Sequence, residues 1–206
     1  MNSLIKKILI TVIFLLLASC SDKKTSLERS SNIIALGDSL TFGYGGNGVT
    51  YPSELEKIIG IKVINEGISG DTSKDVLDRL PTVIDNKPIS LIILSIGGND
   101  MLRGINEAEI VSNINQIIKY FKNLNIEIIL MAEPRPNSAG LIVGLNDAKF
   151  YKKIADENNI LLIEEAFSKP LSNQNLKSDL IHLNSQGYKY VANKVADFLK
   201  KSGYIS

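Results

Sequence analysis

Five short apolar runs, separated by segments of helical periodicity, constrain the fold of this chain more than any other feature. The runs fall at Ile33–Leu36, Ile61–Ile64, Leu91–Ser95, Ile126–Met131 and Ile160–Ile163, and each is rich in β-branched residues and long enough for one buried strand. Helical patterns fall at Tyr51–Ile59, Ser73–Ile84, Glu107–Leu124, Leu145–Asn158 and Ser185–Lys201. Strands that alternate with helices pair in parallel, because a parallel crossover needs a long connection. The pattern predicts an α/β fold, a three-layer α/β/α sandwich around a five-stranded parallel sheet.

The composition narrows the partners that this domain can have. The 206 residues suffice for one globular domain, and 23 basic against 22 acidic residues leave no basic patch for nucleic acid. The chain has a single cysteine, Cys20, and a single histidine, His182, which is too few for a disulfide or for a zinc cluster. We therefore expect no metal and no cofactor. The sequence leaves the oligomeric state open, and a monomer is our expectation.

The N-terminus has the pattern of a targeting segment. Lys6 and Lys7 precede the apolar run Ile8–Leu17, and Ala18-Ser19-Cys20 follows it, which resembles a bacterial lipoprotein signal. We expect residues 1–19 to be the signal peptide, Cys20 to be lipidated, residues 20–31 to form a tether and residues 32–206 to form the domain. The alternatives are an uncleaved anchor helix and an ordinary secretory signal.

Acyl chains on Cys20 would hold the protein on a membrane of the cell envelope. Ser21, where aspartate would signal retention, favours the outer membrane if the host is Gram-negative.

Polar motifs follow the first three predicted strands and precede the last helix. They are Gly37-Asp38-Ser39, then Gly70 within Ile68–Thr72, then Gly98-Asn99-Asp100, and finally the segment from Asp179 to His182. The carboxyl ends of parallel strands meet at one edge of the sheet, where ligands bind. Taken singly, each motif also fits a turn, an Asx cap or a structural histidine. Either Asp71 or Thr72, and either Asn184 or Ser185, would cap the helix that follows it.

Together these motifs supply the parts of a serine hydrolase, which needs a nucleophile, an imidazole base and a carboxylate that orients the base. The set resembles the SGNH (GDSL-type) hydrolase family over Ile33 to about Leu199, and most of all its bacterial thioesterase, lysophospholipase and arylesterase branch. The resemblance implies a flavodoxin-like sheet with strand order 2-1-3-4-5. It also implies that Ser39 is the nucleophile, His182 the general base and Asp179 the orienting carboxylate.

The same resemblance implies an oxyanion hole made of the N–H groups of Ser39 and Gly70 and the side-chain amide of Asn99. It predicts a serine esterase that cleaves lysophospholipids, aryl esters or acyl thioesters through an acyl-serine intermediate. One alternative is a deacetylase of cell-envelope polysaccharide or peptidoglycan, which would need a smaller pocket. A non-enzymatic alternative is a lipoprotein that binds lipids or glycans.

The sequence leaves the function of three segments near these motifs undecided. The stretch Glu133–Leu145 is a candidate wall for the acyl pocket, and Met101–Ile105 is a candidate flap over the substrate; ordinary surface loops are the alternative for both. Gly43–Gly48 matches G-x-G-x-x-G, but it does not begin at the strand end as a dinucleotide fingerprint must. We expect it to form a loop beside Ser39. Leu183 stands where the family commonly has proline.

Overall fold

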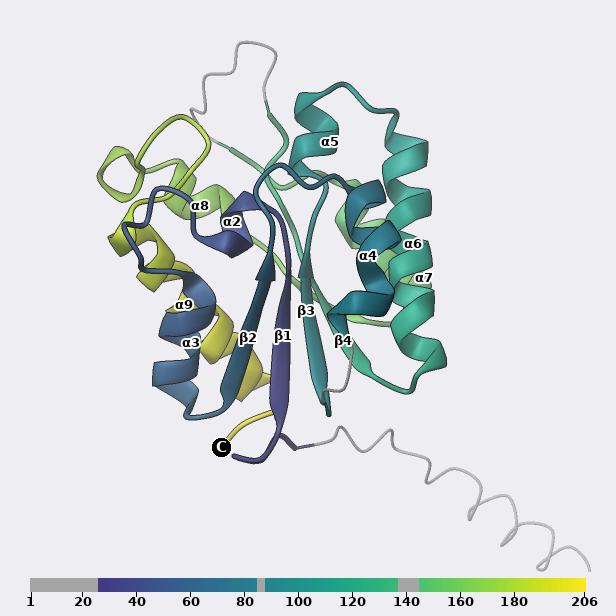
Figure 1. The fold of residues 1–206 in the computed structure, drawn as a ribbon. Helices are drawn as coiled ribbons and strands as arrows, with labels where there is room; N and C mark the ends of the chain where they lie inside the picture. The colour runs from purple at the N-terminus through teal and green to yellow at the C-terminus, as the bar shows by residue number, and fades with distance from the viewer. Residues whose placement is uncertain (1–25, 85–87, 137–144) are drawn as a thin grey trace, which may run out of the picture.

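The computed structural model describes residues 26–84, 88–136 and 145–206 (Figure 1). Five strands form one sheet in the order β2-β1-β3-β4-β5, and every pairing is parallel. The strands are β1 (Asn32–Gly37), β2 (Lys62–Gly67), β3 (Leu91–Ser95), β4 (Glu127–Met131) and β5 (Leu161–Ile163). The fold class and the strand order are therefore confirmed.

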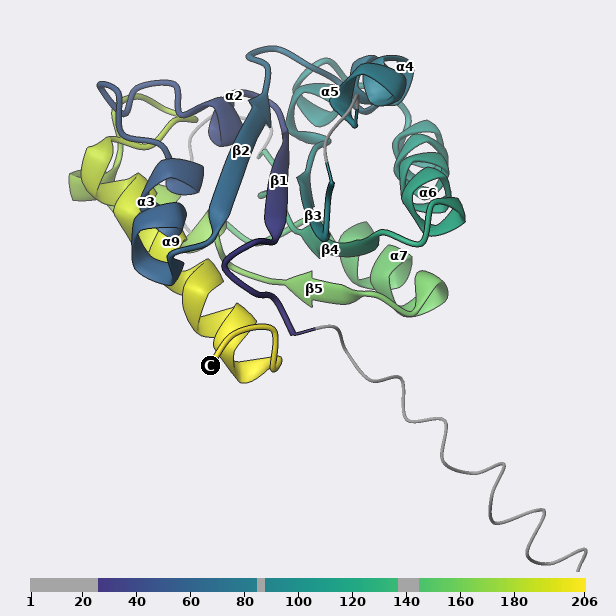
Figure 2. The ribbon, with the colours of Figure 1, turned by 60° about the horizontal axis from the view of Figure 1, so that its bottom comes forward.

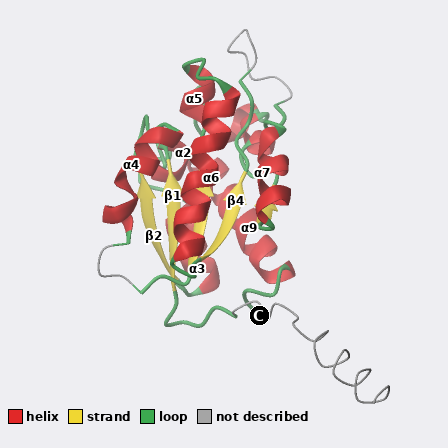
Figure 3. Ribbon diagram, turned by 90° about the vertical axis from the view of Figure 1, so that its right-hand side faces the viewer, coloured by secondary structure: helices red, strands yellow, loops and turns green. Residues whose placement is uncertain are grey.

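Helices cover both faces of the sheet (Figures 1 and 3). One face carries α3 (Tyr51–Ile59) and α9 (Ser185–Lys201), which pack against each other. The other face carries α4 (Ser73–Val83), α6 (Glu107–Asn123) and α7 (Phe150–Asn158). Four short helical segments complete the described part of the chain: α2 (Ser39–Phe42), α5 (Gly98–Leu102), α8 (Ser168–Leu171) and η1 (Gln174–Leu176).

The side chains of β1 show how the two faces divide the core. Ile33 and Ala35 belong to the cluster under α3 and α9, whereas Ile34 and Leu36 belong to the cluster under α4, α6 and α7. Because alternate residues of a strand point to opposite faces, a strand buried on both faces reads as a continuous apolar run. This is why the sequence of β1 shows no polar alternation.

Side-chain caps fix where three helices begin. Thr50 and Ser53 form a reciprocal capping box at α3, and Thr72 forms one with Asp75 at α4. The Asn184 side chain accepts hydrogen bonds from two backbone N–H groups in the first turn of α9. Of the candidate caps proposed from the sequence, Thr72 and Asn184 therefore take that role, which satisfies N–H groups that have no partner inside the helix.

The helix expected over Leu145–Asn158 begins only at Phe150. The preceding residues instead run antiparallel to the segment after β4, through a bridge between Pro134 and Asp147. The Ala148 N–H also donates to the Glu133 carbonyl at 3.0 Å. These contacts join distant parts of the chain, so local periodicity could not reveal them.

Strand β2, expected to end at Ile64, continues to Gly67 because its last residues pair with the end of β1. The end of β1 and the loop after β2 therefore stay close together. The remaining predicted elements agree with the structure to within two residues at each end.

The chain enters the domain at the edge of the sheet opposite the polar motifs. Leu27 is buried, and its N–H donates to the Tyr204 carbonyl at 2.8 Å, so packing begins before Asn32, inside the expected tether. Figure 2 shows the start of β1 close to the C-terminus. Cys20 and the expected signal peptide lie outside the described residues. No helix in the described ranges is long and apolar enough to cross a membrane.

Candidate active site

Ser39 is the first residue of α2 and lies two positions after Gly37, the last residue of β1, so it stands at the carboxyl edge of the sheet. The Asp38 side chain caps this short helix by accepting a hydrogen bond from the Leu40 N–H at 3.0 Å. The preceding Gly37 has no room for a side chain, since a Cβ there would lie 2.2 Å from the Ser95 carbonyl oxygen on β3. The tight exit from β1 thus holds Ser39 in a fixed place.

His182 lies in a compact loop before α9. One oxygen of Asp179 accepts hydrogen bonds from the N–H groups of Ile181, at 2.9 Å, and His182, at 2.8 Å. The Ser178 N–H donates to the His182 carbonyl at 3.0 Å, which closes the loop. The carboxylate and the imidazole, three residues apart in the sequence, are therefore held on one turn.

The three side chains form one hydrogen-bonded series. His182 Nε2 lies 3.0 Å from Ser39 Oγ, and His182 Nδ1 lies 2.8 Å from the second oxygen of Asp179. The imidazole is 13% exposed and the Asp179 side chain 44% exposed. Desolvation acts to raise the pKa of Asp179, but hydrogen bonds from the His182 ring and from two backbone N–H groups outweigh it and lower that pKa. An ionised Asp179 can accept a hydrogen bond from the Nδ1–H of His182, which fixes the proton on that ring nitrogen.

The glycine-rich loop Gly43–Gly48 packs against the histidine loop. Gly45 has φ +80°, and a Cβ there would lie 2.0 Å from Ser178 Oγ. The ring of Tyr44 lies 4.4 Å from the His182 ring, centroid to centroid, and its carbonyl accepts a hydrogen bond from the Tyr188 hydroxyl. The loop therefore supports the imidazole. Its place beside Ser39 was expected from the sequence, but the contact of Tyr44 was not, since an isolated aromatic residue in a loop carries no pattern.

Asn99, on the first turn of α5, faces the loop after β2. Its side-chain NH₂ donates to the Asp71 carbonyl at 2.9 Å and to Asp38 Oδ2 at 3.1 Å. The Gly70 carbonyl is held by the Arg103 guanidinium at 2.8 Å. Among the described residues, neither the Ser39 N–H nor the Gly70 N–H has an acceptor. The Asn99 amide thus links the residue before Ser39 to the residue after Gly70, and it is shared between these two protein acceptors.

Two buried carboxyl groups, those of Asp38 and Glu133, line the same cavity as Ser39. Burial raises the pKa of Asp38 to about 7, with a smaller contribution from the negative charges of Asp71 and Asp100. Burial also raises the pKa of Glu133 well above its ordinary value, and the nearby Asp38 raises it further. The role of Glu133 as a buried acid was not expected from the sequence. The only signal was an acidic residue two positions after an apolar strand.

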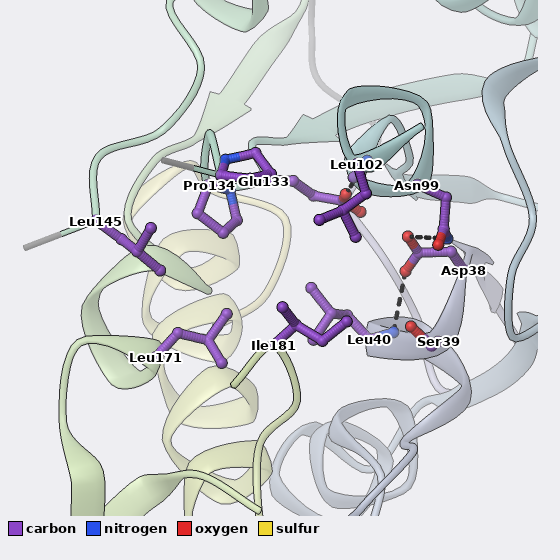
Figure 4. A pocket seen from close by; sticks show the side chains of 12 residues that line it. Asp38, Ser39, Leu40, Asn99, Leu102, Glu133, Pro134, Leu145, Leu171 and Ile181 are labelled. Carbon is purple, nitrogen blue, oxygen red and sulfur yellow. Dashed lines mark hydrogen bonds between the residues drawn. The ribbon is translucent and has the colours of Figure 1, made fainter. Parts of the chain in front are cut away.

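A cavity opens beside Ser39, and its wall is mostly apolar (Figure 4). Pro134, Pro136 and Leu145 line it, so the ends of the Glu133–Leu145 stretch form part of the pocket wall, while residues 137–144 lie outside the described part. Leu102 also lines the cavity; with Met101 it belongs to α5, so this part of the expected flap is helical. The other apolar lining residues are Leu40, Leu171 and Ile181.

In the parts of the chain that the structure covers, no group of three or more His, Cys, Asp or Glu side chains could hold a metal ion. The arrangement around Ser39 instead offers an oxygen nucleophile, a base in contact with it, two unpaired N–H donors and an apolar cavity.

Comparisons with known proteins agree with this geometry. The model of the GDSL-like lipase/acylhydrolase family matches residues 35–190. An arylesterase of Vibrio mimicus is 28% identical over 95% of this chain and 98% of its own length. The thioesterase 1/protease 1/lysophospholipase L1 of Escherichia coli K12 is 31% identical, covering 83% of this chain and 84% of its own. Among solved structures, the SGNH-hydrolase family esterase AlinE4 superimposes with a TM-score of 0.63 at 29% identity, over 86% of this chain and 98% of AlinE4.

Proposed function

Because this chain belongs to the GDSL-like lipase/acylhydrolase family and is a carboxylic ester hydrolase, we propose that it cleaves acyl esters through a covalent acyl-serine intermediate on Ser39. The observation that carries the proposal is the contact of 3.0 Å between Ser39 Oγ and His182 Nε2, with Asp179 bound to the other ring nitrogen. A nucleophile, its base and the group that orients the base are thereby in hydrogen-bonding reach of one another.

In the first half of the reaction, Ser39 Oγ attacks the ester carbonyl while His182 Nε2 takes the hydroxyl proton. The tetrahedral intermediate then collapses, and the imidazolium gives that proton to the departing alcohol or thiol. In the second half, His182 takes a proton from water, the hydroxide attacks the acyl-serine, and the acid leaves as the proton returns to Ser39 Oγ.

Asp179 acts through the imidazole. By accepting the Nδ1–H of His182, it leaves Nε2 as the nitrogen with a free lone pair, which must face Ser39. Its negative charge also stabilises the imidazolium that forms during attack. The two backbone N–H groups that Asp179 binds keep its carboxylate in place.

The substrate oxygen becomes negative in the tetrahedral intermediate, and the N–H groups of Ser39 and Gly70 are free to bind it. The Asn99 amide can add a third donor when one of its two N–H groups leaves its present acceptor. We expect the bond to Asp38 to be the one that is given up, because it is the longer of the two. A donor of this kind typically contributes about 3–4 kcal/mol to the transition state.

The apolar wall of the cavity supports an acyl group with a hydrocarbon chain. Leu102, Leu145 and Leu171 would contact such a chain, and they offer a sugar no hydrogen bond. Lysophospholipids, and aryl esters and thioesters whose acyl group is a hydrocarbon chain, fit this description, and the names of the relatives include arylesterase and lysophospholipase. A deacetylase of envelope polysaccharide would use the same three side chains, so acyl chain length discriminates between the two.

The lipid anchor at Cys20 remains part of the proposal. A chain held at the cell envelope by lipid on Cys20 would partition into detergent and incorporate labelled palmitate. In Cys20→Ser, both properties would disappear while esterase activity remained.

The proposal is tested by hydrolysis of p-nitrophenyl esters from acetyl to palmitoyl, with Ser39→Ala as the control. We expect activity that Ser39→Ala abolishes, with medium or long chains preferred over acetyl. Activity confined to acetyl esters would favour the deacetylase. Hydrolysis that persists in Ser39→Ala would overturn the assigned nucleophile.

A further inference from the structure

Glu133, the second residue after β4, is a buried acid at the inner end of the acyl cavity. We propose that it is a positioning residue, which acts as a neutral carboxylic acid and holds the turn of α5 that carries the oxyanion donor Asn99. This inference rests on the proposed acyl-serine mechanism, because the position of Asn99 matters for catalysis only if Asn99 is an oxyanion donor in that mechanism. It deepens that mechanism by assigning a residue that the sequence motifs do not include.

The contacts of Glu133 reach the start of α5. Its Oε2 accepts the Gly98 N–H at 2.6 Å, and its Oε1 lies 2.8 Å from Ser95 Oγ at the end of β3. Gly98 is the first residue of α5, and Asn99 is the second. Figure 4 shows the Glu133 carboxyl group pointing toward the side of the cavity where Asn99 and Asp38 lie.

Helix α5 needs such a partner. The first N–H groups of a helix have no acceptor within it and are usually bound by the side chain of the capping residue. Here the capping residue is Gly97, which has no side chain and makes no cap hydrogen bond. Glu133 therefore supplies, from a distant part of the chain, the acceptor that Gly97 lacks.

The Glu133 carboxyl group packs closely against the backbone of Gly98, the first residue of α5. A Cβ added at Gly98 would lie 2.4 Å from Oε2 of Glu133 and 3.5 Å from Oδ2 of Asp38. The two carboxyl groups thus enclose the backbone of Gly98 from adjacent sides. We therefore expect a change in the length or polarity of the Glu133 side chain to move this turn, and Asn99 with it.

The surroundings of Glu133 favour its neutral form. The titratable groups that face it are Asp38, Asp100, Tyr51 and Tyr151. None of these is a cation, and no lysine or arginine in the described residues forms a hydrogen bond or ion pair with Glu133. A buried carboxylate without a cation is costly, and two close together are more so.

A neutral Glu133 satisfies both of its partners. An ionised Glu133 accepts a hydrogen bond from the Ser95 hydroxyl; in the neutral form this bond reverses, so that the protonated Oε1 donates to Ser95 Oγ, while Oε2 still accepts the Gly98 N–H. A negative charge at the same place would oppose the negative charge that develops on the substrate oxygen beside Asn99. Glu133 lines the cavity, but its side chain is fully buried and both of its oxygens are bonded within the protein, so we assign it a positioning role and not that of a catalytic acid.

Two substitutions distinguish the hydrogen bonds of the Glu133 side chain from its charge. In Glu133→Gln, the amide oxygen can accept the Gly98 N–H and the NH₂ group can donate to Ser95, so we expect kcat for p-nitrophenyl acetate within about threefold of wild type. In Glu133→Met both bonds are lost, and we expect kcat to fall about thirtyfold, less than the hundredfold or more typical for removal of a whole oxyanion donor. The KM for this short ester should stay within about threefold, because ground-state binding does not use the donor.

A matched control separates this effect from loss of stability. Ile117→Ala truncates a fully buried side chain of α6, in the core cluster that also contains Ala132, the residue before Glu133, and it should lower Tm while leaving kcat unchanged. Wild-type kcat in Glu133→Met would overturn the proposal. An equal loss in Glu133→Gln and Glu133→Met would show that an ionised carboxylate is required, which also overturns it.

NMR tests the inference without any substrate. In protein labelled with [5-¹³C]glutamate at pH 6, the resonance that is absent in Glu133→Gln should have the shift of a protonated acid, whereas exposed glutamates are ionised. The side-chain ¹⁵N–¹H resonances of Asn99 should keep their shifts in Glu133→Gln and move in Glu133→Met. An ionised Glu133 at pH 6, or an Asn99 signal that does not respond to Glu133→Met, would overturn the proposal. Both NMR measurements test the position and protonation of Glu133 without a substrate. If the wild-type protein hydrolysed no ester, the proposed function would fail, but these two measurements would still test the role of Glu133.

Discussion

His182 Nε2 lies 3.0 Å from Ser39 Oγ, although 143 positions separate the two residues in the chain. The contact joins the end of the first strand to the loop before the last helix. It depends on both ends being fixed, Ser39 by its place on the short helix α2 and His182 by the turn that Asp179 closes. Each of these supports can be tested separately.

Removing the charge of Asp179 should disable the imidazole. In Asp179→Asn the amide can donate to His182 Nδ1 and so favour the tautomer whose Nε2 carries the proton, which cannot accept the Ser39 proton. We expect kcat to fall by about three to four orders of magnitude, as is typical of this change in serine hydrolases. The measurement is kcat for p-nitrophenyl butyrate. Asp156→Asn, at an exposed ion pair on α7, is the control, and a loss of less than tenfold in Asp179→Asn would contradict the assigned role.

The oxyanion role of Asn99 predicts an effect on kcat more than on KM. Asn99→Ala should lower kcat about a hundredfold or more, because a donor used mainly in the transition state is lost. Steady-state kinetics on the same ester would measure both constants. Asn193→Ala, an exposed amide on α9, should change neither constant. A rise in KM with kcat unchanged would place Asn99 in ground-state binding instead.

Gly45 and Gly48 offer a matched pair for testing the loop that supports His182. Both have positive φ, so alanine strains the backbone by about 1–2 kcal/mol at either position. Only at Gly45 would the new Cβ collide with Ser178, since nothing lies within 4 Å at Gly48. We expect kcat to fall tenfold or more in Gly45→Ala, because misplacing a catalytic group by about 1 Å can cost a hundredfold.

Thermal melts separate backbone strain from the collision. Both variants carry the strain of alanine at positive φ, and only Gly45→Ala adds the collision with Ser178, so Gly48→Ala should melt at or above Gly45→Ala and keep wild-type kcat. Equal kcat values for the two variants would show that the loop does not position the imidazole.

The buried acids predict that stability falls as pH rises. A carboxyl group whose pKa is higher in the folded than in the unfolded protein stabilises the fold at low pH, and this contribution is lost as pH rises through the folded value. For Asp38 the window runs from about 4, the unfolded value, to about 7. Glu133, whose pKa is also raised, contributes in the same direction.

Thermal melts from pH 5 to pH 8 would measure this effect. The Tm of wild type should fall across the window, and Glu133→Gln should remove part of the fall because the amide does not titrate. A steeper fall in Glu133→Gln than in wild type would contradict the predicted direction of the Glu133 contribution.

The cavity wall predicts which change alters chain-length preference. Leu145→Trp adds bulk to a side chain that lines the cavity, so the preferred ester should shift toward acetyl while activity on acetyl is kept. The measurement is kcat/KM across p-nitrophenyl esters of increasing length. Leu124→Trp, at an exposed site after α6, is the control. An unchanged profile in Leu145→Trp would place the acyl group elsewhere.

The parallel sheet could be anticipated because strands buried on both faces leave continuous apolar runs such as Ile33–Leu36, whereas the strand order was implied only by the resemblance to the SGNH hydrolase family. The positions of Ser39, Asn99 and His182 at one edge followed from their places after strands and before a helix. Helices α2 and α5 were not expected, since four or five residues are too few to show helical periodicity.

Other features depend on contacts between distant residues. The burial of Glu133 depends on Ser95 and Gly98, which are 38 and 35 positions away. The pairing of Asp147 with Pro134, which delays α7, also bridges a segment that local sequence patterns do not connect.

Covalent capture of Ser39 tests the central claim most directly. The protein is treated with a p-nitrophenyl alkylphosphonate, which transfers its phosphonyl group to an activated serine and releases p-nitrophenol, and the product is measured by intact-protein and peptide mass spectrometry. We predict one phosphonyl group per chain, located on Ser39, and none in Ser39→Ala or His182→Ala. Stoichiometric labelling at another residue, or labelling of Ser39→Ala equal to wild type, would contradict the assignment of Ser39 as the nucleophile.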